Sequence, residues 1–432
     1  MYTADELQIN QNGELTIGGI AATELSRIYG TPLYVMDEDK IRTACRIYRD
    51  AIDKYYGGNG LVLYASKAFC CKQMCRIANE EGLGIDVVSG GELYTAISSG
   101  FPSERIYFHG NNKSEDELEM AVDNHVGCVI IDNEEELLIL DEICRNKSKK
   151  MRVMFRVKPG VEAHTHEFIK TGQEDSKFGV SLENGEAFEL VKKAYALQNV
   201  EVVGVHCHIG SQIFDLSPFE LAAQRMMGLI IRVKEELGQT LQQLNLGGGF
   251  GIRYEDADDP IPYDSYIESV SKVIKKICSE HDIPLPYILM EPGRSIVGPA
   301  GYTLYTVGAI KEIPEIRTYL SVDGGLSDNP RFILYGARYR AVIANRASEP
   351  QTKCYTISGK CCESGDVICD DVLLQEAKRG DCLCVLATGA YNYSMSSNYN
   401  RIKKPAVVMV RDGKHYVAVK PESFEDLVRN DI

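Results

Sequence analysis

Long apolar segments are missing from this 432-residue chain. No stretch approaches about 18 consecutive apolar residues, so the sequence predicts no transmembrane helix. The first ten residues, MYTADELQIN, contain neither the basic nor the apolar segment with which a secretory signal begins. The 14 cysteines include no CxxC pair, which argues against a structural zinc site. We therefore expect a cytoplasmic protein whose cysteines are reduced thiols.

An excess of positive charge is also absent. The chain has 47 lysines and arginines against 62 acidic residues, which gives a formal net charge of −15. Such a surface disfavours binding to nucleic acid and to anionic membranes. A few local arginines still suffice to bind a small anion. We therefore expect a small-molecule substrate and neither a nucleic-acid nor a membrane partner.

Eight short β-branched or apolar runs alternate with helix-like segments over the first two-thirds of the chain. The runs lie at 61–65, 84–88, 105–108, 127–131, 151–157, 200–207, 243–247 and 286–291, and the helix-like segments include 113–125, 133–146, 184–197 and 217–238. Asn133 precedes three glutamates, a pattern typical of a helix N-cap with an acidic first turn. This alternation fits a (β/α)₈ barrel as well as a doubly wound sheet.

The residues that end these runs favour the barrel. Chemically reactive types follow run after run: Lys67, Asp86, His109 with Asn111, Arg156, His208 with Ser211, Gly247 to Gly249, and Glu291 with Arg294. A barrel gathers the C-terminal ends of all its strands at one mouth, whereas a doubly wound sheet offers one crevice. We predict an α/β protein with a (β/α)₈ barrel over residues 33–292.

The texture of the sequence changes after about residue 295. Strand-like runs at 302–310, 318–322, 339–344, 353–358, 382–387, 406–410 and 415–419 are separated by Gly, Pro and Asp turns. They predict a mostly antiparallel β domain over residues 293–432. Residues 1–32 contain the strand-like pieces LQIN and ELTI, which we assign to the same domain.

Lys67 ends the apolar run LVLYASKA (61–68). An ammonium in apolar surroundings is costly unless it is paired or neutralised. A lysine that reaches from a strand end to solvent is one explanation. The other is an amine that is kept neutral so that it can bond to the carbonyl of a substrate or of pyridoxal phosphate.

Two motifs near the ends of later runs suit a phosphorylated pyridine. The glycines of GGGFG (247–251) let backbone N–H groups approach a phosphate, although a tight turn also explains them. Glu291 of EPGR can pair with a protonated pyridine nitrogen, and Arg294 can bind a phosphate or carboxylate. An ion pair between these two side chains is the alternative.

Histidine and cysteine motifs leave further alternatives open. His206 and His208 alternate on one run, so they share a face and suit either metal ligation or stacking of His208 on an aromatic cofactor. A second HxH, formed by His164 and His166, lies in a polar stretch that predicts a loop. Cys361 to Asp366 place thiols beside carboxylates, which is either local structure or a proton donor.

Six motifs in one order resemble a known family: YASKA, HIGSQ, GGGFG, EPGR, CESGD and GAYNYSMSSNYN. They are similar to the pyridoxal phosphate-dependent decarboxylases with an alanine-racemase-type barrel (fold type III). The stretches VEAHTHEFIKTGQEDSKFG (161–179) and FHGNNKS (108–114) resemble the members that convert meso-diaminopimelate to L-lysine and CO₂ in the last step of lysine synthesis. The resemblance covers roughly residues 15–425, and six motifs in register are specific where one alone is weak.

The resemblance implies how pyridoxal phosphate is bound. Lys67 would hold it covalently, His208 would stack on its ring, and Glu291 would meet the pyridine nitrogen. The implied phosphate ligands are Ser211, Gly248, Gly249 and Arg294, and the remaining cofactor contacts are Asp86, Pro292, Gly293 and Tyr391. No metal is expected.

The resemblance also implies substrate residues and a partner. Cys362 would donate a proton and Glu363 would contact the substrate, both reaching into the site of the neighbouring subunit of a head-to-tail homodimer. Diaminopimelate carries a distal carboxylate that is costly to leave unpaired in a closed site. Arg294 and Arg331 are therefore candidate substrate ligands, together with Tyr335 and Tyr391.

Three other functions compete with this assignment. A relative acting on arginine, ornithine, lysine or carboxynorspermidine is disfavoured by Arg331 and by the 161–179 stretch. A non-catalytic regulatory paralogue is disfavoured because Lys67, Glu291 and Cys362 are all retained. A barrel metallohydrolase depends on the HxH motifs alone.

Overall fold

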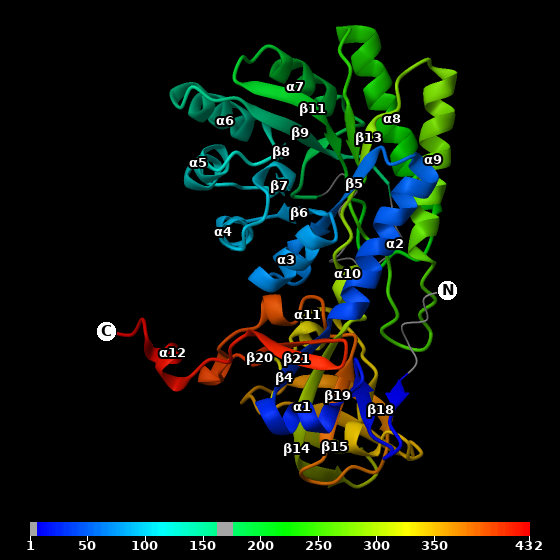
Figure 1. Cartoon of the computed structure of the whole chain (residues 1–432), viewed down its shortest axis with the longest axis vertical. Coiled ribbons are helices and arrows are strands. Elements are labelled where there is room, and N and C mark those ends of the chain that lie inside the picture. Colours follow the sequence, from blue (N-terminus) through cyan, green and yellow to red (C-terminus); the bar gives the residue numbers. More distant parts are fainter. Residues whose placement is uncertain (1–6, 162–175) are drawn as a thin grey trace. The chain divides into compact units, whose positions relative to one another are not determined.

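The protein is described by a computed structural model that covers residues 7–161 and 176–432 (Figure 1). Two compact units make up the chain. The barrel unit comprises residues 44–251 and 260–293. The β unit comprises the described residues up to Thr43, the short segment 252–259, and residues 294–432.

Eight parallel strands close into a barrel in the barrel unit (Figure 1). They are β5 (Gly60–Ala65), β6 (Gly84–Val87), β7 (Ile106–Phe108), β8 (Cys128–Ile131), β9 (Met151–Lys158), β11 (Val200–His206), β12 (Gln243–Asn245) and β13 (Tyr287–Met290). The last strand, β13, pairs with the first, β5, so the sheet has no open edge along this path. All eight predicted runs form these strands, and the prediction of a barrel is confirmed.

Helices follow the strands around the barrel (Figure 1). They are α3 (Lys72–Glu80), α4 (Gly90–Ser98), α5 (Glu115–Asp123), α6 (Glu134–Asn146), α7 (Glu186–Tyr195), α8 (Ser217–Leu237) and α9 (Tyr263–Glu280); α2 (Glu38–Tyr56) precedes β5. The predicted N-cap of α6 is confirmed, because Asn133 Oδ1 accepts a hydrogen bond of 2.9 Å from the backbone N–H of Glu136. A short strand, β10 (Val180–Ser181), pairs with β9.

The barrel interior is filled by side chains from alternating strand positions. One buried cluster consists of Leu63, Tyr107, Cys128, Ile130, Met154, Val203 and Leu289. Each buried side chain of this size contributes roughly 1.5–3 kcal/mol relative to exposure. The barrel is therefore a packed core, and functional side chains must come from the ends of its strands.

The β unit is built on a second, mostly antiparallel sheet. Its strands are β4 (Leu33–Asp37), β14 (Gly301–Ile313), β15 (Arg317–Val322), β16 (Ala341–Ile343), β17 (Lys353–Ser358), β18 (Val367–Leu374), β19 (Cys382–Leu386), β20 (Ala406–Arg411) and β21 (Lys414–Val419). Two pairs, β15–β17 and β20–β4, are parallel. The prediction of a mostly antiparallel domain is confirmed, although β18 was not predicted.

Two differences from the sequence prediction concern strands of this unit. The boundary at residue 33 assigned Leu33–Asp37 to the barrel, whereas β4 pairs with β14 and β20. All five residues of β4 are buried, as in a barrel strand, so its composition does not distinguish the two sheets. In β18, Asp370 and Asp371 interrupt the apolar pattern.

The N-terminal pieces form a small sheet in the β unit. β1 (Gln8–Ile9), β2 (Leu15–Ile17) and β3 (Ile20–Ala21) are antiparallel neighbours, and α1 (Ala22–Tyr29) follows them. Leu15 and Ile17 pack in one core cluster with Leu33 and Leu304. Three short helices complete the unit: α10 (Arg294–Val297), α11 (Arg331–Tyr335) and α12 (Phe424–Val428). Among the described residues, no helix combines the length and apolar character needed to cross a membrane.

Candidate active site

Lys67 lies on a single 3₁₀ turn, Ser66–Ala68, that follows β5. Its neighbours Ser66 and Ala68 are buried, whereas Lys67 itself is exposed. A hydrogen bond to helix α4 holds this turn in place: Ser66 Oγ donates to Glu92 over 2.9 Å. Lys67 therefore reaches solvent from a strand end, which leaves its amine accessible for bond formation.

Pro292 and Gly293 pack against the same strand. The backbone N–H of Ala65 donates a hydrogen bond of 3.2 Å to the carbonyl of Pro292. A Cβ added to Gly293 would lie 2.9 Å from the Cβ of Ala65. This contact is tighter than side chains normally make, so a side chain at position 293 would push against β5.

Asp86 comes from β6 and is buried. Its Oδ1 accepts no hydrogen bond within the described residues, and it lies 3.9 Å from His109 Nε2. Burial raises the pKa of Asp86 to about 6, while the charges of His109 and Lys67 oppose this shift. A buried carboxylate oxygen without a partner is unusual and is typical of a ligand-binding position.

Glu291, which follows β13, lies at the centre of a buried polar cluster. Its Oε1 is 2.8 Å from His109 Nε2 and accepts a hydrogen bond of 2.6 Å from Asn245 Nδ2. Its Oε2 is 3.2 Å from His206 Nε2. We call these four residues the Glu291 cluster. Burial would raise the pKa of Glu291, but His109 and His206 outweigh it and hold the pKa well below its usual range. Glu291 is therefore an ionised carboxylate.

The histidines of this cluster also bear on the metal hypothesis. Burial lowers the pKa of His206 to about 4, and Glu291 only partly offsets this, so His206 is neutral near pH 7. The ligand atoms of His109, His206 and Glu291 lie within 4.8 Å of one another, a spacing compatible with a metal ion. His208 is not in this group, so the HxH motif does not supply two ligands to it.

Asn245 joins the Glu291 cluster to the glycine-rich loop, Gly247 to Gly249. Its Oδ1 accepts a hydrogen bond of 2.9 Å from Gly247 N–H, and Glu291 N–H donates one of 2.7 Å to the Gly247 carbonyl. A Cβ on Gly248 would lie 2.1 Å from the Glu291 carbonyl oxygen, and a Cβ on Gly249 would lie 2.4 Å from the Gly210 carbonyl oxygen. The loop therefore requires glycine, because it packs backbone against backbone.

His208 and Ser211 follow β11 and border this loop. The backbone N–H of Gly248 donates a hydrogen bond of 3.3 Å to His208 Nδ1. Burial and the charge of Lys67 hold the pKa of His208 well below its usual range, so the half-buried ring is neutral. Ser211 is also half-buried. A flat, neutral imidazole suits stacking on an aromatic cofactor.

The β unit contains a second group of expected site residues, which we call the arginine–tyrosine cluster: Arg294, Arg331, Tyr254, Tyr339 and Tyr391. Arg294 Nη1 donates a hydrogen bond of 2.6 Å to the Tyr254 hydroxyl, and its Cζ lies 4.7 Å from the centre of the Tyr391 ring. Arg331 Nη1 donates one of 2.7 Å to the Tyr339 hydroxyl, and its Cζ lies 4.8 Å from the centre of the Tyr254 ring.

Arg331 is 7% exposed, and within ranges 7–161 and 176–432 it forms no ion pair with a carboxylate. Buried charges in proteins are normally paired. Burial would raise the pKa of Tyr254, but Arg294 and Arg331 outweigh it and lower that pKa below its usual range. Arg331 therefore contributes a positive charge to the cluster that aromatic groups and hydroxyls compensate in part.

Tyr391 has a left-handed backbone conformation, with φ of 63°. The left-handed region is uncommon for a tyrosine and costs of order 1–3 kcal/mol. Two residues before Tyr391, the backbone at Gly389 passes so close to another segment that a Cβ on Gly389 would lie 1.9 Å from the Val297 carbonyl oxygen. The next residue, Asn392, is fully buried. The surrounding packing thus imposes the orientation of Tyr391.

Cys362 and Glu363 are both exposed on the β unit. Their turn is held by buried Asp366, whose Oδ2 accepts a hydrogen bond of 2.7 Å from Cys361 N–H. Cys362 N–H donates one of 2.7 Å to Asn400 Oδ1. Tyr335, at the end of α11, is half-buried, and Arg331 bonds to Tyr339 instead. The β unit therefore leaves both Cys362 and Glu363 accessible at its surface.

The sequence prediction missed five residues of these two groups. His109 and His206 were recognised as reactive types but received no role beside Glu291. Asn245 lies inside a predicted strand, and only its polar type in an apolar run signals a function. Tyr254 and Tyr339 lie outside the motifs, and no local pattern identifies them. His164 and His166, with most of the predicted loop around them, lie outside the described residues.

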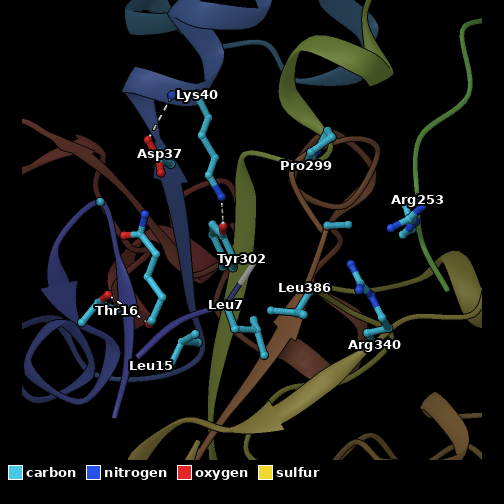
Figure 2. Close-up of a pocket in the computed structure, with 13 residues that line it drawn as sticks. Leu7, Leu15, Thr16, Asp37, Lys40, Arg253, Pro299, Tyr302, Arg340 and Leu386 are labelled. Carbon is cyan, nitrogen blue, oxygen red and sulfur yellow. Dashed lines mark hydrogen bonds between the residues drawn. The ribbon is translucent and has the colours of Figure 1, made fainter. Parts of the chain in front are cut away.

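A separate pocket lies within the β unit (Figure 2). It is lined by Leu7, Gln8, Leu15, Thr16, Gly18, Asp37, Lys40, Arg253, Pro299, Tyr302, Arg340, Leu386 and Ala387. Lys40 Nζ donates a hydrogen bond of 2.6 Å to the Tyr302 hydroxyl. The two arginines of the pocket lie near acidic residues. Arg340 Nη1 is 3.4 Å from Asp256 Oδ1, and Arg253 Nη2 is 3.9 Å from Asp259 Oδ1. None of the predicted site residues lines this pocket.

The barrel unit fits pyridoxal phosphate, which brings a pyridine nitrogen, a carbonyl and a phosphate. The Glu291 cluster presents an ionised carboxylate for a protonated ring nitrogen. The glycine-rich loop offers backbone without side chains for the phosphate. Lys67 offers an accessible amine, and Asp86 an unpartnered carboxylate oxygen.

Known proteins resemble the chain over almost its whole length. The family described as "Pyridoxal-dependent decarboxylase, pyridoxal binding domain" matches residues 38–298. The chain is 49% identical over 423 residues to the diaminopimelate decarboxylase of Bacillus subtilis (strain 168), covering 98% of this chain and 96% of that protein. It is 48% identical to the Staphylococcus aureus (strain COL) enzyme of the same name, covering 98% and 99%.

A solved structure agrees with these matches. The diaminopimelate decarboxylase of M. jannaschii in complex with L-lysine superposes with a TM-score of 0.91 and 34% identity, covering 100% of this chain and 99% of that one. Both the sequence relatives and the solved structure therefore extend over the barrel unit and the β unit. The chain belongs to the pyridoxal-dependent decarboxylase family.

Proposed function

We propose that this protein decarboxylates meso-diaminopimelate to L-lysine and CO₂ with bound pyridoxal phosphate. The observation that carries the choice of substrate is Arg331, a buried guanidinium without a carboxylate partner in the described chain. A substrate with a distal carboxylate supplies that partner, whereas ornithine, lysine and arginine carry only distal cations. The names of the relatives and the lysine complex of the solved structure support the same choice.

Four sets of residues would hold the cofactor in this proposal. Lys67 would bind it covalently through its amine. The glycine-rich loop, Ser211 and Arg294 bind its phosphate, and Asp86, Pro292, Gly293 and Tyr391 make the remaining contacts. His208 stacks on its ring. The bound group supplies an electron sink for the pair left on the α-carbon when CO₂ departs.

The Glu291 cluster keeps that sink effective. The ionised carboxylate of Glu291 would face the ring nitrogen and would keep that nitrogen protonated. His206 and Asn245 fix the carboxylate from two sides, so it needs no reorganisation during the reaction. Its buried position keeps competing water away from the ion pair.

Substrate binding and the final proton transfer involve the β unit. Arg331 binds the distal carboxylate, with Arg294, Tyr335 and Tyr391 as further substrate contacts. We propose that Glu363 binds the distal ammonium and that the Cys362 thiol donates a proton to the α-carbon. Both are exposed, which agrees with their serving the site of a second copy in a cytoplasmic homodimer.

The test is product formation with pyridoxal phosphate added, run in parallel on meso-diaminopimelate, ornithine, lysine and arginine. L-lysine and CO₂ from diaminopimelate, with negligible turnover of the other three, is the expected result. Preferred turnover of ornithine, lysine or arginine would keep the cofactor but overturn the role of Arg331. Cofactor binding without turnover of any substrate would favour a regulatory relative.

A further inference from the structure

We propose that Tyr254 is a positioning residue shared by two anion-binding arginines, Arg294 and Arg331, and that it couples cofactor binding to substrate selection. The inference rests on the proposed function, in which Arg294 binds the cofactor phosphate and Arg331 the distal carboxylate of the substrate. Tyr254 itself belongs to none of the motifs that identify the family resemblance, and we assign it no contact with either ligand.

Tyr254 contacts both arginines, and hydrogen bonding of its hydroxyl to each of them contributes to its lowered pKa. Its hydroxyl accepts the 2.6 Å hydrogen bond from Arg294 Nη1. Its ring faces Arg331, whose Cζ lies 4.8 Å from the ring centre, while Arg294 Cζ lies 5.6 Å away. Tyr254 is 8% exposed, so water competes little with these contacts. One phenol therefore fixes two guanidinium groups.

The physical need for such a residue is mutual repulsion. Two guanidinium groups that contact one buried ring repel each other in a medium of low dielectric constant. An electron-rich ring attracts both cations without neutralising either, which a carboxylate in its place would do. The lowered pKa of Tyr254 reports the same positive potential from both sides. Tyr254 thus leaves both arginines charged.

Tyr339 provides a natural contrast because it serves one arginine only. Its hydroxyl accepts the 2.7 Å hydrogen bond from Arg331 and a second, of 3.3 Å, from Asn392 Nδ2. Its ring meets Tyr254 edge-on, with centres 5.4 Å apart. The two tyrosines are equally aromatic and both buried, but only Tyr254 bonds to Arg294.

The experiment compares Tyr254→Phe with the matched control Tyr339→Phe. For each variant we measure the dissociation constant of pyridoxal phosphate from the apo protein, and then kcat and KM for meso-diaminopimelate. The thermal unfolding midpoint of each protein sets a working temperature at which both variants are folded. We expect Tyr254→Phe to weaken cofactor binding about tenfold and to raise KM several-fold, with a smaller change in kcat. We expect Tyr339→Phe to raise KM alone.

A double variant tests the coupling itself. In an Arg331→Ala background, Tyr254→Phe should still weaken cofactor binding but should raise KM by a smaller factor than in the wild-type background, because the part of its effect that acts through Arg331 is already lost. Equal cofactor affinity of wild type and Tyr254→Phe would overturn the proposal, as would equal effects of the two tyrosine variants on cofactor binding. If diaminopimelate were not the substrate, the cofactor measurement would still decide the link between Tyr254 and Arg294.

Discussion

The Glu291 cluster and the arginine–tyrosine cluster solve opposite electrostatic problems. The first buries an anion beside two imidazoles and one amide, and the amide of Asn245 donates to it. The second buries two cations and surrounds them with aromatic faces and hydroxyls. The buried anion lies among polar side chains, whereas the two buried cations lie against aromatic rings and tyrosine hydroxyls.

This difference shows how a protein keeps a buried charge usable. Full pairing of Glu291 with a lysine, or of Arg331 with a carboxylate, would stabilise the charge but leave nothing for a ligand. Neutral donors and aromatic rings compensate only part of the charge. Each cluster therefore retains a net charge of one sign, negative beside the barrel strands and positive in the β unit.

The largest effect is expected from Lys67, which lies outside both clusters and which we propose as the residue that binds the cofactor covalently. Lys67→Ala should remove the visible absorption band of the covalently bound cofactor and lower kcat/KM at least about 10³-fold. Absorption spectroscopy and steady-state kinetics measure both effects. Lys72→Ala, an exposed lysine at the start of α3, is the control. A retained band would refute the assignment of Lys67.

Glu291→Gln breaks the anionic cluster while keeping its shape. The amide cannot hold the ring nitrogen protonated, so kcat should fall about 10²- to 10³-fold although Lys67 still binds the cofactor. The absorption band and kcat are measured on the same preparation. An unchanged kcat in the presence of that band would show that the negative charge of this cluster has no role in the reaction.

Arg331→Ala breaks the cationic cluster on its substrate side. Loss of the charge-assisted hydrogen bonds to the distal carboxylate should raise KM for meso-diaminopimelate about 30- to 100-fold. Cofactor affinity should change little, because Arg294 remains. The exposed Arg338→Ala is the control. Equal losses of substrate and cofactor binding would contradict a separate substrate role.

Asp86→Asn sharpens the comparison, because Asp86 is a buried anion that lacks the donors of Glu291. Its folded-state pKa of about 6 lies above the ordinary value, so its ionisation destabilises the apo protein as pH rises from about 4 to 6. The variant should therefore be more stable than wild type by about 1–3 kcal/mol at pH 7. The gain should shrink as the pH is lowered through 6 towards 4.

Urea denaturation of the apo proteins at pH 7 and at pH 4.5 measures this difference. The exposed Asp53→Asn on α2 should show no comparable gain at either pH. A loss of stability for Asp86→Asn at pH 7 would mean that the buried carboxylate is stabilised by its surroundings. Asp86 would then resemble Glu291 in its electrostatics.

Sequence reasoning located the barrel strands because each is a short apolar run bounded by turns. It missed β18, where Asp370 and Asp371 break the run, and its domain boundary at residue 33 placed β4, which is buried along all five residues, in the barrel. Burial on both faces is common to barrel strands and to the central strands of a packed sheet. Only the pairing partners distinguish them, and these are long-range contacts.

The same limit applies to the site. Lys67, His208 and Glu291 lie in motifs at strand ends, where a reactive residue type after an apolar run is a visible signal. Asn245 and Tyr254 act on residues that are distant in sequence, so their roles depend on which strand ends meet. The sequence around Asn245 or Tyr254 contains no local pattern that predicts these long-range contacts.

Asn245 has a consequence for how variants of this protein will combine. Its amide bonds to Glu291 on one side and to the glycine-rich loop on the other, and Glu291 N–H returns to the Gly247 carbonyl. The position of the glycine-rich loop and the position of the Glu291 carboxylate are therefore coupled. A Gly248→Ala change, whose Cβ would meet the Glu291 carbonyl at 2.1 Å, moves both at once. The effects of substitutions in the loop and at Glu291 should therefore be strongly non-additive, as expected for residues that belong to one hydrogen-bond network.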